Sequence, residues 1–278
     1  MESLLKKNQK KIGQLLAVSA VFGVGVYFLA KKFMKQPESV PPAPNSLDTS
    51  CLKNSSFLKS ADYQQKVETI RILLNSQPKN TPKTKIITAI IQLVVDLYKT
   101  KFTQLYLNNR IQRRSVISNK TLYAQLVAEG SQEGEQLFEE ATLQVISDIE
   151  WSYEEYNAEV EQAAAQDPAF MKYVTYLYSS VKVRINEKQG KQITADLLVQ
   201  FFQLQIDVLN QGELREFDGL ELNQSLMCKQ TFLGDVAAVK LGFEEEEIAM
   251  NLELLNRAEV IQKQNELTEK LKGSLGMV

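Results

Sequence analysis

The chain has 278 residues, of which 44% are hydrophobic and 24% charged, and its net charge is −2. This length is enough for one sizeable domain or two small ones, and the nearly balanced charge provides no general basic field for nucleic acid. The chain has two cysteines and no histidine. Histidine-based catalytic dyads and triads, Cys/His zinc motifs and the common haem ligands are therefore excluded, whereas carboxylate chemistry is not.

The first feature along the chain is a strongly apolar segment that follows a basic tail at residues 1–11. Residues 12–30 carry no charge, and as a helix they would span about 28 Å, close to the hydrocarbon core of a bilayer. Lysines at both ends can extend to the headgroups, namely Lys10, Lys11, Lys31 and Lys32. We predict a single transmembrane anchor at 12–30, with membrane-facing side chains that include Leu15, Leu16, Val24, Tyr27 and Phe28.

Two other interpretations of this segment are a cleaved secretory signal and a buried core helix. A signal would have a shorter apolar region, but here the apolar run continues well beyond the small residues Val18-Ser19-Ala20. A core helix is rarely flanked by lysine pairs at both ends. The anchor is therefore favoured. Its orientation is not determined, because positive charge is nearly balanced across it.

Residues 31–60 form a predicted tether between the anchor and the remaining chain. Four of the seven prolines lie here, among serine and asparagine residues that favour turns. Residues 36–60, as flexible coil, would reach roughly 25 to 30 Å. The tether would therefore keep the following domain close to the bilayer.

From residue 61 onward, apolar residues recur at helical spacing. Tyr63, Val67, Ile70 and Leu74 lie on one face of a first predicted helix, which ends before the prolines in QPKNTP. We predict further helices at 83–114, 119–129, 133–165, 168–186, 192–211, 222–241 and 244–272. No alternating strand pattern is present. Residues 61–278 are therefore predicted to form an all-α bundle of about seven or eight long helices.

The sequence contains no nucleotide-binding loop motif and no hydrolase motif. Carboxylate pairs such as Glu139/Glu140 are interpreted as solvated, and the acidic run 244–247 as a helix N-terminus. Trp151 is interpreted as a packing residue. We expect no enzymatic activity, no metal, no cofactor, no small-molecule substrate and no nucleic-acid partner. A membrane enzyme that uses carboxylates alone is the least favoured alternative.

Three arginines lie together at the end of the predicted helix 83–114, at Arg110, Arg113 and Arg114. Cations are expected at a helix C-terminus because they complement its dipole. In a membrane-tethered protein the same cluster could also contact anionic lipid headgroups.

The segment KKIGQLLAVSAVFGVGVYFLAKKFMKQ, with Gly25-Val26-Tyr27 before the second lysine group, resembles the N-terminal anchor of the peroxisomal biogenesis factor three (peroxin three) family. The segments IRILLNSQPKNTPKTKIITAIIQLVVDLYKTKFTQLYLNNRIQ and LYAQLVAEGSQEGEQLFEEATLQVI are similar to the helices that follow in that family. The resemblance covers roughly 10–35 and 65–150. The chain is shorter than most members and lacks the tryptophan that they often carry at the start of the long helix.

The resemblance implies a cytosolic helical domain on the peroxisomal membrane that binds an amphipathic helix of the shuttling receptor, peroxin nineteen. Its partners would be peroxin nineteen and membrane lipids. Recognition of a helix in a groove fits the apolar helix 83–114. The predicted contact residues are Ile86, Ile90, Ile91 and Leu93, which could equally fill the bundle core. The alternative function is a structural subunit of a mitochondrial or endoplasmic-reticulum membrane complex.

Overall fold

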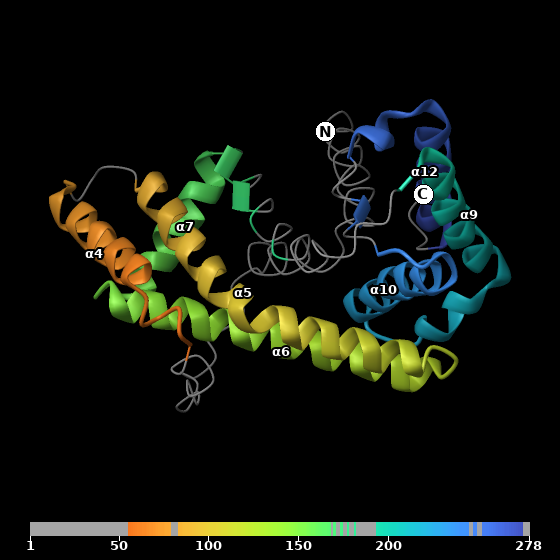
Figure 1. Cartoon of the computed structure of the whole chain (residues 1–278), viewed down its shortest axis with the longest axis horizontal. Helices are drawn as coiled ribbons and strands as arrows, with labels where there is room; N and C mark the ends of the chain where they lie inside the picture. Colours follow the sequence, from red (N-terminus) through yellow and green to blue (C-terminus); the bar gives the residue numbers. More distant parts are fainter. Residues whose placement is uncertain are drawn as a thin grey trace. The chain divides into compact units, whose positions relative to one another are not determined.

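The computed structural model describes residues 55–78, 83–167, 169–170, 173–174, 177, 181, 193–244, 247–248 and 252–274. The regular structure in these ranges is helical, as predicted: α4 (Ala61–Ser76), α5 (Thr84–Ser115), α6 (Lys120–Asp148), α7 (Tyr153–Gln166), α9 (Ala195–Gln211), α10 (Leu222–Leu241) and α12 (Ala258–Ser274), with short 3-10 helices η2 (Glu213–Phe217) and η3 (Leu252–Asn256) (Figure 1). The predicted anchor and nearly all of the tether lie outside the described residues. Within the described part of the chain, no helix is long and apolar enough to cross a bilayer.

The described residues divide into two compact units, where the sequence predicted one bundle. The N-terminal unit contains residues 55–107 and 131–181, and the C-terminal unit contains residues 108–130 and 193–274. Helices α5 and α6 each contribute residues to both units. Each unit has its own apolar core.

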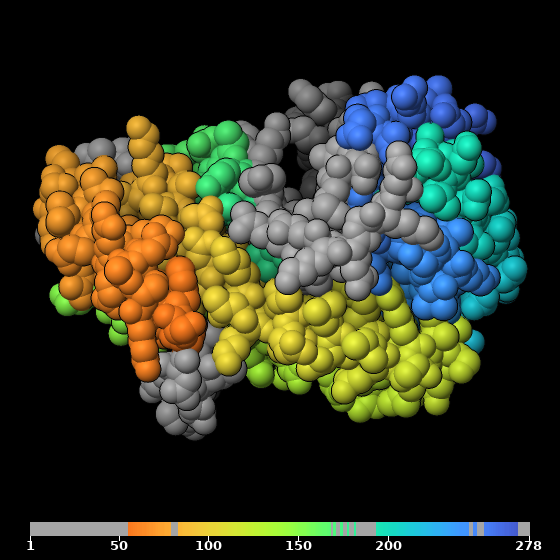
Figure 2. Space-filling model, in the orientation of Figure 1, coloured from red at the N-terminus to blue at the C-terminus, as the bar shows by residue number. Residues whose placement is uncertain are grey.

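The core of the N-terminal unit is built from α4, the first part of α5, the second part of α6, α7, and the buried residues Phe170, Val174, Leu177 and Val181 that follow it. The apolar face of α4 contributes Tyr63, Val67 and Ile70, as its spacing predicted. In the space-filling view α4, in orange, lies at the surface of this unit (Figure 2). The first part of α5, from Ile86 to Tyr98, is buried around most of its circumference, as expected where apolar residues do not form a single stripe.

The break between α6 and α7 differs from the prediction, which placed it near Gly130. Helix α6 continues through Gly130, where a Cβ atom would lie 2.4 Å from Asn109 Nδ2. The glycine therefore permits close approach of α5. The chain instead leaves the helix at Glu150, which has a φ of 57°, and α7 restarts where the Ser152 hydroxyl accepts a hydrogen bond from the Glu155 amide.

The C-terminal unit packs α9, α10 and α12 around two apolar clusters. Helices α9 and α10 end at Gly212 and Gly242, whose φ values of 73° and 70° suit glycine. The predicted helix at 244–272 is divided by η3. The buried Val260 lies five residues after the partly buried Leu255, a spacing that would place them on different faces of one straight helix. The break allows both to reach the same core.

Candidate functional site

The four predicted partner-binding residues all lie in the core of the N-terminal unit. Ile86, Ile90, Ile91 and Leu93 have exposed fractions of 1%, 0%, 4% and 1%. In this conformation they pack against other apolar residues and offer no surface to a partner. Their role in partner binding stays a prediction.

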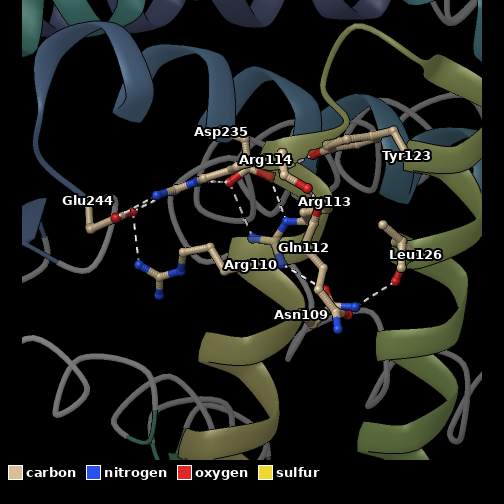
Figure 3. Close-up of polar contacts among 10 residues, drawn as sticks. Asn109, Arg110, Gln112, Arg113, Arg114, Tyr123, Leu126, Asp235 and Glu244 are labelled. Atoms are coloured by element: carbon tan, nitrogen blue, oxygen red, sulfur yellow. Dashed lines mark hydrogen bonds and ion pairs between the residues drawn. The ribbon is translucent and has the colours of Figure 1, made fainter.

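The most extensive polar arrangement in the described structure joins the three predicted arginines to two carboxylates. The arginines project from the end of α5, one carboxylate comes from the middle of α10, and the other follows the end of α10 (Figure 3). We call this arrangement the arginine–carboxylate network. Its members are Arg110, Arg113, Arg114, Tyr123, Asp235 and Glu244.

Asp235 is the centre of the network and has a side chain only 2% exposed. Its Oδ2 accepts hydrogen bonds from Arg113 Nε at 2.5 Å and from the Tyr123 hydroxyl at 2.8 Å. Its Oδ1 accepts from Arg114 Nε at 2.7 Å and from Arg113 Nη2 at 3.3 Å. Four donors thus surround a carboxylate that lies in an otherwise apolar stretch of α10.

Glu244 binds the outer side of the same arginines. Arg114 makes a bidentate contact, with Nη1–Oε1 and Nη2–Oε2 distances of 2.7 and 2.6 Å, and Arg110 Nη1 lies 2.9 Å from Oε2. The backbone amide of Glu244 donates to Glu247 Oε2 at 2.6 Å. This contact supports the predicted helix start in the acidic run, because a glutamate three residues into a helix commonly reaches back to its first residue.

A second hydrogen-bond chain orients Arg113 from the other side. Arg113 Nη1 donates to Asn109 Oδ1 at 2.9 Å, and Asn109 Nδ2 donates to the Leu126 carbonyl on α6 at 2.7 Å. Gly130 on α6 leaves the space that the Asn109 side chain occupies. The network therefore ties α5, α6 and α10 together within the C-terminal unit.

The electrostatics of the network favour ionised carboxylates at neutral pH. Burial alone would raise the pKa of Asp235, but the guanidinium groups of Arg113 and Arg114 hold that pKa below its ordinary value. The pKa of Glu244 is likewise lowered by Arg114 and Arg110 against the effect of burial. Burial, with the nearby Asp235 charge, raises the pKa of Tyr123. A carboxylate that is ionised at neutral pH and saturated with donors is poorly suited to proton transfer, so the network is suited to hold helices together.

These positions bear on the predicted lipid contact of the three arginines. Arg110 and Arg113 are 4% and 6% exposed, and Arg114 is bonded to both carboxylates. In this conformation the guanidinium groups face protein carboxylates, and their contact with lipid stays a prediction. Arg113 and Arg114 do lie in the last turn of α5, as the helix-dipole interpretation expects.

Sequence reasoning missed Asp235 as a network member. The available signal was a single acidic residue inside the apolar run FLGDVAAV, which needs a buried cation to be tolerated. Elsewhere, burial raises the pKa of the Cys228 thiol to about 12. Among the described residues no group of side chains could hold a metal ion. The predicted anchor and flanking residues, from Lys10 to Lys32, lie outside the described part of the chain.

Comparison of the chain with protein-family models, with curated proteins and with solved structures found no match. The resemblance to the peroxin three family therefore stays a prediction from the sequence.

Proposed function

We propose that this chain is a membrane-anchored docking receptor without enzymatic activity, of the kind that the resemblance to the peroxin three family implies. Its partner would be an amphipathic helix of peroxin nineteen, and its location the peroxisomal membrane, with the helical part facing the cytosol. The function would be to support insertion of peroxisomal membrane proteins.

The observation that carries the proposal is the order of features along the sequence. A lysine-flanked apolar segment of bilayer length is followed by a proline-rich tether and then by helices. This order suits a protein that holds a binding surface near a membrane. The all-helical fold of the described residues is compatible with recognition of a partner helix.

Two experiments test the proposal. The full-length chain in lipid nanodiscs should bind the N-terminal helix of peroxin nineteen with micromolar or tighter affinity, and absence of binding at that concentration would contradict it. In cells, the tagged protein should lie on peroxisomes, and its deletion should deplete them. A mitochondrial or endoplasmic-reticulum location with stable copurification of other membrane subunits would favour the structural-subunit alternative.

A further inference from the structure

Helix α4 is an amphipathic helix that lies against the other helices of the N-terminal unit. Tyr63, Val67 and Ile70 are 1%, 4% and 3% exposed, and Leu74 packs partly buried on the same core. These residues recur at intervals of four and three. The same spacing is found in amphipathic helices that bind in the apolar groove of a receptor protein.

Polar contacts fix the position of α4 on the unit. The Tyr63 hydroxyl donates to Asp148 Oδ2 at 2.6 Å, and Lys66 Nζ lies 3.6 Å from Asp96 Oδ2. At the other end, Arg71 Nη2 donates to Glu150 Oε1 at 2.7 Å. We call the part of the N-terminal unit that α4 covers the α4-binding surface, and these three acidic residues mark it.

The contact between Arg71 and Glu150 at the end of α4 is exposed and incompletely paired. The Glu150 side chain is 75% exposed and that of Arg71 is 33% exposed, so water screens the attraction between them. The Nε atom of Arg71 is buried without an acceptor. An exposed ion pair contributes little to stability, so this contact holds the helix weakly.

The place of α4 in the chain also permits its release. It is the first helix of the N-terminal unit to be described, and it follows the predicted tether. Among the described helices, its release would not interrupt the connection between any two others. Only three of its 16 residues are buried, whereas the first part of α5, from Ile86 to Tyr98, is buried on most sides.

We propose that α4 is a displaceable occupant of the surface on which an amphipathic helix of a partner binds. This inference rests on the docking function proposed above and adds its regulation. A competing helix would carry apolar residues at the spacing of Tyr63, Val67 and Ile70, and cationic side chains opposite Asp96 and Glu150. The predicted contact residues Ile86 and Ile90 share the core that α4 covers, so their burial in the free chain is expected.

Displacement predicts a measurable effect on affinity. Only chains that have released α4 bind the partner helix. The apparent dissociation constant therefore equals the intrinsic constant divided by the fraction of chains that have released α4. Substitutions that weaken the packing of α4 on the unit should therefore raise the affinity for the partner helix. If α4 were an ordinary core helix, the same substitutions would leave that affinity unchanged or lower it.

The first test uses a fluorescent peptide with the sequence of residues 61–76 as the probe, added to the full chain in nanodiscs. The Val67→Ala/Ile70→Ala variant should bind the peptide about tenfold or more tightly than the wild type. Ile72→Ala is the matched control, because Ile72 lies on the same helix but is 58% exposed, and it should bind as the wild type does. Arg71→Ala leaves the apolar core intact and should give a smaller gain in affinity for the peptide. It tests the proposal independently in case the double variant does not fold. Equal binding by the wild type, the double variant and Arg71→Ala would overturn the proposal.

The second test uses hydrogen exchange with the N-terminal helix of peroxin nineteen. When that helix binds, the amides of 61–76 should exchange faster, while those of α5 stay protected because the partner helix replaces α4. Binding that leaves α4 fully protected would refute displacement and leave the docking function standing. Binding of the 61–76 peptide to the loosened variant, with no binding of peroxin nineteen to any variant, would support displacement and contradict the proposed partner.

Discussion

Replacement of Asp235 by asparagine should strongly destabilise the C-terminal unit. The substitution keeps the shape of the side chain but removes the negative charge between Arg113 and Arg114, and it places an amide group against donors. The Arg113 side chain is 7% exposed, so its charge would stay buried without compensation. Removal of one partner from a buried ion pair typically costs about 3–5 kcal/mol, and we expect a loss of that size.

The assay is urea unfolding of the full chain, followed by hydrogen exchange of the α10 amides to report on this unit separately. Glu266→Gln is the control, because Glu266 lies in the same unit, is 40% exposed and pairs only with Lys263 among the contacts described. It should change stability by less than about 0.5 kcal/mol. The double variant Asp235→Leu/Arg113→Met should recover part of the loss, because it removes both buried charges. A loss below about 1 kcal/mol for Asp235→Asn would refute the reasoning.

Three further predictions concern pH and the two helix features that the sequence did not place. Both network carboxylates have a lowered pKa when folded, so their stabilisation is present at neutral pH and is lost as pH falls below their ordinary values of 3.8 and 4.5; acid unfolding of Asp235→Asn should therefore be less steep than that of the wild type. In urea unfolding, Glu150→Gly should have a free energy of unfolding about 1 kcal/mol higher than Glu150→Ala. Both variants lose the Arg71 contact, but only glycine relieves the left-handed backbone. The reverse order of stability would contradict this. Gly130→Ala should lower the melting temperature, because its Cβ would displace Asn109, whereas Gly134→Ala has its nearest neighbour 3.5 Å away and should raise it through helix propensity. Similar shifts for the two glycine variants would show that the close approach is unimportant.

The helical class and most helix positions could be predicted from the sequence, because they depend on local periodicity and capping. The start of α4 follows Ser60, and the end of α10 precedes Gly242, as residue preferences indicate. The break at Glu150 was missed because the apolar stripe stays in phase across it, from Val145 through Tyr156. The capping pair Ser152 and Glu155 was the available local signal.

The arginine–carboxylate network could be predicted only in part. The position of Arg113 and Arg114 in the last turn of α5 follows from the sequence. Their partner Asp235 lies more than a hundred residues away on α10, and periodicity within one helix does not specify which helix packs against it. The division into two units has the same cause, since it depends on which core each half of α5 and α6 joins.

The burial of the predicted docking residues is compatible with the proposed docking function, because a receptor that left such a surface exposed would be less stable. An apolar surface large enough to bind a helix costs about 25 cal/mol for each Å² left in water, and large exposed patches promote aggregation. A free receptor is therefore more stable when another element covers that surface. In this chain the apolar face of α4 packs on the core that contains Ile86 and Ile90. The proposed role of Ile86 and Ile90 therefore depends on whether a partner helix can replace α4. The sequence pattern alone is the same for a residue of this kind and for an ordinary core residue.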